Sequence, residues 1–128
     1  MVLLAASPQE QFTTHQIAAT LLASESHLSK VLQRLVRADM VKSIRGPKGG
    51  FTIIKSSEKV TLQEIFELFE GPLTDTQCLL ENTVCQGERC VLGDLLEKVN
   101  RETRTYLATT TLTDLTHIFT RQSLKQKV

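Results

Sequence analysis

The sequence predicts a mainly α-helical chain with one small β-hairpin and a long helix near its end. Apolar residues recur with helical spacing through much of the 128-residue chain. Two short β-prone runs flank a Gly/Pro turn at 46–50, which is the pattern of a hairpin. Aromatic residues make up only 5% and tryptophan is absent, as fits a helical protein. Two helices followed by a hairpin are typical of a winged helix-turn-helix, and we expect a C-terminal dimerisation helix after it.

The first part of the chain carries the signals of two short helices. We expect residues 1–7 to form the last turns of a helix whose beginning is absent. Thr13 with Gln16 three residues on is a capping box, so a helix from about 14 to 22 should follow. The residues predicted to face inward from this helix are Ile17, Ala18, Leu21 and Leu22.

The next helix, expected over about 25–38, has two chemically different faces. Ser24 precedes it as a candidate N-cap, because a serine oxygen can accept a bond from an unpaired amide one turn on. The apolar positions i, i+3, i+4, i+7 and i+8 are Leu28, Val31, Leu32, Leu35 and Val36. The other face carries His27, Ser29, Lys30, Gln33, Arg34 and Arg37.

Positive charge is concentrated in this helix and in the hairpin that follows it. From His27 to Lys55 there are seven Lys/Arg against Asp39 alone, a local charge of +6, whereas the rest of the chain carries −5. Such segregation indicates a surface that faces an anion. A solvated helix face would explain the basic residues of the helix but not the basic hairpin tip as well. The pattern therefore favours a nucleic-acid partner.

In this fold the second helix enters the major groove with its N-terminal end at the base edges. The residues predicted to read bases are Ser26, His27, Ser29 and Lys30. Arg34 and Arg37 are placed to meet phosphates. In the hairpin tip Arg45 and Lys48 are the predicted contacts, with Gly49 allowing the backbone to approach DNA closely. The alternative for His27 is a surface histidine without a role, and His15 and His117 receive no predicted role.

The second half of the chain contains a short helix, an irregular stretch and a longer helix. Thr61 with Glu64 is a second capping box, and Gly71 with Pro72 ends the helix it starts. The predicted buried face of this helix is Leu62, Ile65, Phe66 and Phe69. The longer helix, about 91–108, carries an apolar stripe of Leu92, Leu95, Leu96, Val99, Tyr106 and Leu107. Because a small domain leaves it little core to cover, we expect this stripe to pack on a partner chain.

Three stretches with different tasks follow from these elements. Residues 1–72 are the predicted winged helix-turn-helix DNA-binding domain, and 73–90 are a cysteine-containing sensor loop. Residues 91–128 are the predicted dimerisation helix and C-terminal tail. Within this last stretch a short helix should start at 111–114.

All three cysteines, Cys78, Cys85 and Cys90, lie in the irregular stretch. An irregular loop can wrap three thiolates around one centre, and thiolates select soft metals. The gaps of six and four residues are neither the CxxC pair of a zinc ribbon nor a ferredoxin run. Three interpretations stay open from the residues alone: an iron–sulfur cluster, a redox thiol switch, and three inert cysteines.

The sequence also predicts where the protein works and what it does not do. Neither a membrane span nor a signal peptide is present, so we expect a cytoplasmic chain in which the cysteines stay reduced. The sequence shows no nucleophile–base set, phosphate-binding loop or buried carboxylate pair, and we therefore expect no enzyme.

The hairpin run Arg45–Phe51 resembles the wing signature of the Rrf-two family of bacterial winged-helix regulators, which includes IscR-like and NsrR-like members. The similarity extends back through 27–35 and forward through 60–65, the cysteine loop and the long helix. The resemblance implies a homodimer joined through the helix near 91–108, on a near-palindromic double-stranded DNA operator. It also implies an iron–sulfur cluster, of the 2Fe-2S or 4Fe-4S type, whose gain, loss or nitrosylation alters DNA affinity. Its ligands would be Cys78, Cys85 and Cys90.

The combined prediction is a transcriptional repressor that senses redox state, nitric oxide or iron–sulfur status. A fourth cluster ligand is not assigned, because the position that holds a histidine in IscR-like members is Gly93 here. The alternatives are a regulator switched by a thiol–disulfide change without a cluster, and a winged-helix module that binds protein.

Overall fold

The computed structural model of the chain describes residues 1–74, 78–80, 84–85 and 90–119. The chain forms two compact units. One consists of Met1–Val60 with Thr111–Val128, and the other, Thr61–Thr110, is inserted between these two parts. We refer to them as the winged-helix unit and the α4–α5 unit. None of the helices in the described residues is long and apolar enough to cross a lipid bilayer.

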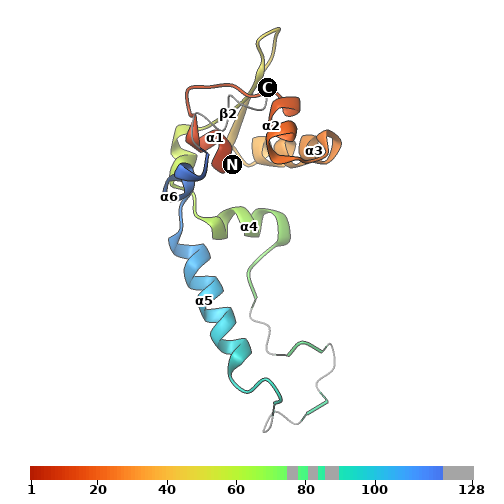
Figure 1. Ribbon diagram of the computed structural model, residues 1–128, viewed down its shortest axis with the longest axis vertical. Coiled ribbons are helices and arrows are strands. Elements are labelled where there is room, and N and C mark those ends of the chain that lie inside the picture. The colour runs from red at the N-terminus through yellow and green to blue at the C-terminus, as the bar shows by residue number, and fades with distance from the viewer. Residues whose placement is uncertain (75–77, 81–83, 86–89, 120–128) are drawn as a thin grey trace. The chain divides into compact units, whose positions relative to one another are not determined.

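The winged-helix unit contains short helices around one antiparallel hairpin (Figure 1). In chain order its elements are α1 (Val2–Ala6), α2 (Thr14–Leu21), α3 (Glu25–Arg37), β1 (Val41–Ile44), β2 (Gly50–Ile53), the 3-10 helix η1 (Lys55–Lys59), α6 (Leu112–Leu115) and the 3-10 helix η2 (Thr116–Ile118). This order confirms the predicted winged helix-turn-helix.

Local sequence signals start the helices α2 and α3. The Thr13 hydroxyl oxygen accepts a bond from the Gln16 amide (3.2 Å), and the Thr13 amide donates to the Gln16 side chain (2.9 Å), so the predicted capping box is present. The Ser24 hydroxyl accepts from the His27 amide at 3.5 Å, which confirms the predicted cap of α3.

The predicted inward face of α2 is only partly correct. Ile17 and Ala18 are buried, but Leu21 is 44% and Leu22 84% exposed. Helix α2 ends at Leu21, and Leu22 adopts a left-handed conformation with φ 53°. A residue in that conformation leaves the helical spiral, so the side chain of Leu22 no longer lies on the inner face.

The core of the winged-helix unit draws on nearly all its elements. Its buried apolar residues are Leu3, Leu4, Ala5, Ile17, Ala18, Leu28, Leu32, Leu35, Val41, Ile53 and Leu112. In α3 the apolar face is narrower than predicted, because Val31 and Val36 are only half-buried. Leu112 of α6 has no exposed surface at all. The chain therefore returns to this core after it has formed the α4–α5 unit.

The hairpin is extended by one backbone bridge from the segment before α2. Val41 lies opposite Ile53, and Ile44 opposite Gly50. The Phe12 amide donates to the Phe51 carbonyl (3.0 Å), and the Phe51 amide donates to the Phe12 carbonyl (2.8 Å). The bridge ties β2, near the turn of the hairpin, to the chain that leads into α2.

The α4–α5 unit contains helices α4 (Leu62–Glu70) and α5 (Leu95–Thr109), which pack against each other. The predicted capping box starts α4: the Thr61 amide donates to the Glu64 carboxylate at 2.8 Å, and Gly71 ends the helix at φ +86°. Helix α5 begins at Leu95 rather than near 91 as predicted. Residues 91–94 form a turn, because Gly93 takes a left-handed conformation with φ +55° that a helix does not contain.

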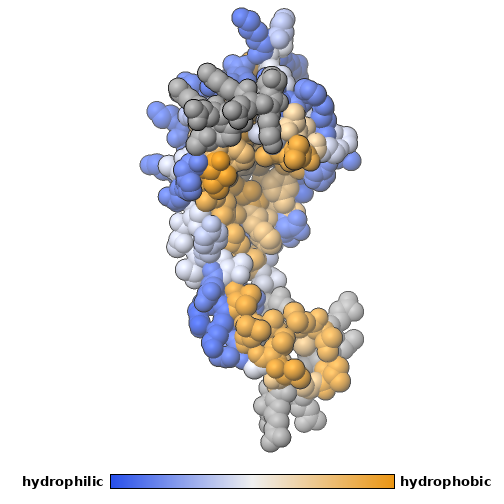
Figure 2. Space-filling model, viewed as in Figure 1, coloured by the Kyte–Doolittle hydropathy of each residue, from blue (hydrophilic) through white to orange (hydrophobic). Residues whose placement is uncertain are grey.

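None of the described residues in the α4–α5 unit is buried. The residues of α4 that were predicted to be buried are therefore only partly covered. Leu62, Ile65 and Phe69 are half-buried, and Phe66 is 37% exposed. On α5 the side chains of Leu95, Val99 and Tyr106 are all at least half exposed. In Figure 2 the part of the molecule that holds α5 is hydrophobic on one side and hydrophilic on the other.

Candidate nucleic-acid interface

Helix α3 presents a polar and basic surface because its apolar residues fix which side faces the core. Leu28, Leu32 and Leu35 are buried, so the opposite side of the helix must face solvent. The exposed residues of α3 on that side include His27, Lys30, Gln33, Arg34 and Arg37. The structure thus brings the predicted basic residues of α3 onto one open face.

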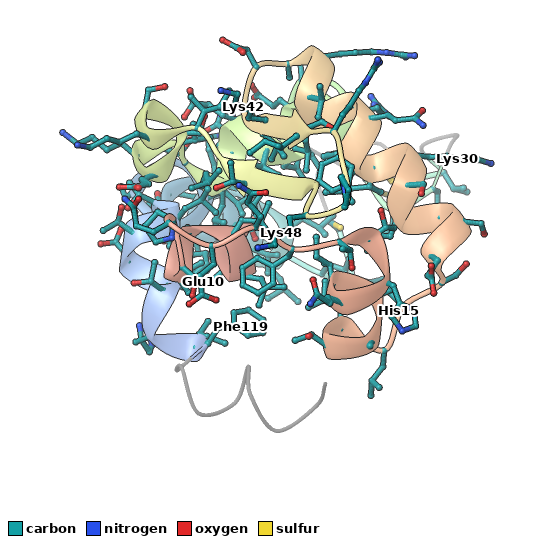
Figure 3. The ribbon with its side chains drawn as sticks, turned by 90° about the horizontal axis from the view of Figure 1, so that it is seen from above. Glu10, His15, Lys30, Lys42, Lys48 and Phe119 are labelled. Carbon is teal, nitrogen blue, oxygen red and sulfur yellow. The ribbon has the colours of Figure 1, made fainter. Side chains whose placement is uncertain are left out.

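The residues predicted to read bases lie in the first two turns of α3. Ser26, His27 and Lys30 are exposed, whereas Ser29 is half-buried. The Ser26 hydroxyl lies 2.9 Å from that of Ser24. Figure 3 shows the Lys30 side chain extending outward from α3. These side chains are therefore open to a ligand at the N-terminal end of the helix.

A histidine that the sequence did not single out lies beside this end of α3. His15 Nδ1 of α2 is 2.6 Å from the carboxylate of Glu25, the acidic residue in the first turn of α3 (Figure 3 labels His15). The pair joins the two helices of the helix-turn-helix. Because the two residues are ten positions apart and belong to different helices, no helical spacing in the sequence indicates the contact.

The hairpin tip is a tight turn with exposed basic side chains. The Gly49 amide donates to the Gly46 carbonyl at 2.8 Å, and Gly46 has φ +120°. Arg45 and Lys48 are exposed, as is Lys42 on β1. In Figure 1 the tip projects beyond α2 and α3, which belong to the same unit.

The two glycines at the end of the turn are required by the hairpin itself. A Cβ atom on Gly49 would collide with the carbonyl oxygen of Ile44, and one on Gly50 would lie 2.8 Å from the carbonyl oxygen of Phe12. From the sequence, Gly49 was predicted only to let DNA approach closely. The structure gives a second and sufficient reason for a glycine there, which is its close packing against the carbonyl oxygen of Ile44 at the end of β1.

Within the described residues, the positive charges of Lys30, Arg45 and Lys48 are not balanced by a neighbouring carboxylate. In the part of the chain that the structure describes, no carboxylate lies at ion-pair distance from any of these three side chains. Unpaired cations on an exposed helix and an adjacent hairpin tip suit the phosphates of a nucleic acid.

The three cysteines lie in the other unit and are free thiols. Cys78 is half-buried, and Cys85 and Cys90 are exposed. The Leu80 amide donates to Cys78 Sγ at 3.4 Å. Within the described residues no three His, Cys, Asp or Glu side chains converge to hold a metal ion, and 75–77, 81–83 and 86–89 lie outside them. The thiol chemistry fits an iron–sulfur cluster, but the described geometry does not contain an assembled site.

Comparisons of the sequence identify its relatives. The Rrf2 family model, described as an iron-dependent transcriptional regulator, matches residues 1–118. The putative HTH-type regulator BadM of Rhodopseudomonas palustris is 43% identical over 74 residues, which are 58% of this chain and 47% of BadM. The HTH-type regulator CymR of Bacillus subtilis is 30% identical over 99 residues, 77% of this chain and 67% of CymR. This chain thus spans about half the length of BadM and 60% of two Neisseria meningitidis relatives.

Solved structures show the same fold. CymR of B. subtilis, described as the global cysteine regulator, matches with a TM-score of 0.72 and 27% identity over 93% of this chain and 88% of that one. A putative transcriptional regulator of Listeria innocua matches with a TM-score of 0.66 and 29% identity, covering 99% and 85% of the two chains. IscR of T. potens matches with a TM-score of 0.64, covering 90% and 76%, and at 23% identity this likeness concerns the fold alone.

The names of these relatives are those of transcriptional regulators rather than of enzymes, as the sequence predicted. The wing run Arg45–Phe51, which carried the predicted resemblance, lies within the residues that the family model matches. The chain belongs to the Rrf2 family of transcriptional regulators.

Proposed function

We propose that the protein binds a double-stranded DNA operator through α3 and the hairpin tip and represses transcription. The observation that carries this proposal is the exposed basic side of α3, held outward by the buried leucines on its other side. The basic hairpin tip of the same unit supports it. Ser26, His27, Ser29 and Lys30 would meet base edges, whereas Arg34, Arg45 and Lys48 would meet phosphates. Gly49 would shape the wing without a direct role in reading DNA.

The DNA-binding proposal is tested by titrating labelled DNA, selected from a random library by the protein, at several salt concentrations. Operator binding should weaken with a log–log slope of about −0.9 per phosphate neutralised. Lys30→Ala should reduce discrimination between selected and random DNA by about 1–3 kcal/mol, whereas Arg45→Ala should weaken binding to both. Lys98→Ala, on the exposed surface of α5, is the matched control and should change neither. Salt-independent binding would favour the alternative of a protein-interaction module.

We propose further that the protein acts as a homodimer joined through α5. The exposed apolar residues Leu95, Val99 and Tyr106 support this, since they leave hydrophobic area that a second α5 would cover. A dimer would also present two α3 helices to a near-palindromic operator whose half-sites are about one helical turn apart. Sedimentation equilibrium should give a dimer for the wild type and a monomer for Val99→Glu. The control Glu102→Gln, at an exposed polar position of the same helix, should remain dimeric.

The third proposal is that Cys78, Cys85 and Cys90 are the sensor and hold an iron–sulfur cluster. Their thiol chemistry supports it, as does the description of the family as iron-dependent. A bound cluster would supply a centre that reacts to redox state or nitric oxide. The alternative is a cluster-free switch, in which peroxide takes two electrons and two protons from two thiols to give one disulfide and water.

Anaerobic purification and reconstitution with ferrous iron and sulfide separate these two sensors. A cluster should give a visible absorbance with matching iron and sulfide content, and Cys85→Ser should lower both. A colourless protein after reconstitution would remove the cluster. Mass spectrometry of alkylated protein after peroxide exposure would then distinguish a disulfide from inert cysteines.

A further inference from the structure

The first residue after the Gly71–Pro72 turn that closes α4 is held by side chains from two helices. The Leu73 amide donates to Glu67 Oε1 of α4 at 3.3 Å, and Arg104 Nη2 of α5 donates to the Leu73 carbonyl oxygen at 3.3 Å. A loop residue ordinarily gives such backbone groups to water or to a neighbouring strand. Here both are taken by charged side chains, one acidic and one basic.

The carboxylate of Glu67 is itself fixed in place. Gln63 Nε2, one turn earlier on α4, donates to the same Oε1 atom at 2.8 Å. The bonds from Gln63 and from the Leu73 amide hold the pKa of Glu67 below its usual value. Desolvation opposes them, and the positive charge of Arg104 adds the smallest lowering effect. Glu67 is therefore charged at neutral pH and attracts Arg104. We call Gln63, Glu67, Leu73 and Arg104 the loop staple.

The loop staple gives the cysteine-containing segment a second attachment to α5. The first is covalent, because the segment runs through the turn in which the Gly93 amide donates to the Cys90 carbonyl (3.0 Å) and enters α5 at Leu95. The second is Arg104, nine residues into α5, about 14 Å further along the helix axis at 1.5 Å per residue. Cys78 is five residues after Leu73, so a change that pulls on Cys78 reaches the stapled peptide groups through a short length of chain.

We propose that the loop staple transmits the chemical state of the loop cysteines to α5, with Glu67 and Arg104 acting as positioning residues. Rotation of the Leu73 peptide groups breaks the bonds to Glu67 and Arg104 at once and removes the hold of Arg104 on the segment. The proposal rests on the proposed function, in which the cysteines sense and α5 joins the dimer. It adds the residues that connect these two tasks.

The test uses hydrogen exchange of the full chain, followed by mass spectrometry, before and after alkylation of the thiols with N-ethylmaleimide. In the wild type, alkylation should speed exchange of α5 peptides around Arg104. In Arg104→Gln and Glu67→Gln this response should be lost, while exchange near Leu73 is fast from the start. Arg101→Gln is the matched control, since Arg101 lies on the same helix and pairs with Glu97 at 3.7 Å instead of with the loop. It should respond as the wild type does.

Two outcomes would overturn the proposal: unchanged α5 exchange in alkylated wild type, and an Arg104→Gln variant that responds as strongly as Arg101→Gln. Glu67→Gln keeps the side-chain shape but removes the negative charge that strengthens the bond from the Leu73 amide, so it serves if Arg104→Gln loses its helical circular dichroism. DNA binding of the same samples separates this proposal from the sensor function. If α5 responds to alkylation while DNA affinity does not, the loop staple stands and the sensor function fails.

Discussion

The two units of this chain contain the same kind of amphipathic helix with opposite results. In α3 of the winged-helix unit, Leu28, Leu32 and Leu35 are buried by their own chain. In α5 of the α4–α5 unit, Leu95 and Val99 stand at helical spacing but are each about half exposed. The apolar period thus predicts a helix in both places. It does not say whether the same chain or a second one covers the apolar face.

This difference has an energetic consequence. Burying a leucine side chain contributes about 1.5–3 kcal/mol to folding. In the winged-helix unit the buried apolar side chains come from four helices and two strands, whereas no described residue of 61–110 is buried. We therefore expect the winged-helix unit to set the stability of the monomer and the α4–α5 unit to depend on association.

The largest expected effect comes from truncating a leucine in each unit. Leu112→Ala removes a side chain with no exposed surface and should cost about 2–5 kcal/mol of unfolding free energy. Leu95→Ala removes a half-exposed side chain and should cost less than about 1 kcal/mol in the monomer, with a larger loss at concentrations where the dimer forms. Urea denaturation at several protein concentrations measures both. If the two variants lost the same unfolding free energy in the dilute monomer, the winged-helix unit would not be the part that sets the stability of the monomer.

Glycines in the two units provide the second test. Gly50→Ala places a Cβ 2.8 Å from the Phe12 carbonyl oxygen, and overpacking of this kind costs about 1–3 kcal/mol. In Gly93→Ala the added Cβ has no atom within 4 Å. The loss of unfolding free energy should therefore come only from holding an alanine in the left-handed conformation, about 1 kcal/mol. Thermal melting gives the two losses, and amide exchange at Phe51 should rise in Gly50→Ala alone. Unchanged exchange at Phe51 would show that the Phe12 bridge tolerates the methyl group.

Removing one buried hydroxyl of the winged-helix unit should stabilise the protein, in contrast to the substitutions above. Ser7 Oγ is buried and has no hydrogen-bond partner within the part of the chain described, so its desolvation is not compensated. Ser7→Ala should stabilise the protein by about 1 kcal/mol. Thr61→Ala, which removes the capping hydroxyl of α4, should instead destabilise by about 1 kcal/mol. If Ser7→Ala lowers the melting temperature, the hydroxyl has a partner that the described residues do not include.

Signals that act over three or four residues were predictable from the sequence. The capping boxes at Thr13 and Thr61 and the Gly/Pro turn of the hairpin were all correct, because each depends on neighbours in the chain. The basic side of α3 was predictable for the same reason, since helical spacing alone places Lys30 and Arg34 on one side.

Contacts between distant residues were not predictable. His15 meets Glu25, Phe12 meets Phe51, and Arg104 meets Leu73, and no period or motif links the members of these pairs. The start of α5 was placed too early because an apolar stripe does not reveal that Gly93 leaves the helix. The cysteines could be named from the sequence, but their spacing does not determine how the loop brings them together.

The smallest expected effects are pH-dependent and compare one carboxylate from each unit. In α6 the Asp114 carboxylate accepts bonds from the Thr111 hydroxyl (2.7 Å) and the Thr111 amide (2.8 Å), which lower its pKa below the ordinary value of an aspartate. In α4 the pKa of Glu67 is lowered below the ordinary value of a glutamate, first by the bond from Gln63. A lowered pKa in the folded state means that the unfolded chain binds protons more readily. The stabilising effect of each group is therefore complete above its ordinary pKa and is lost as the pH falls through the lowered value.

Melting curves from about pH 7 to about pH 3 should distinguish the two groups. Asp114→Asn should flatten the acid dependence of the winged-helix unit, because Thr111 and Asp114 cap the helix that carries the buried Leu112. Glu67→Gln should leave that transition unchanged and alter only the exchange of α4 and α5 peptides. If both variants flatten the same transition to the same extent, the two units unfold together. The exposed apolar side of α5 would then not make the α4–α5 unit a separate and weaker part of the chain.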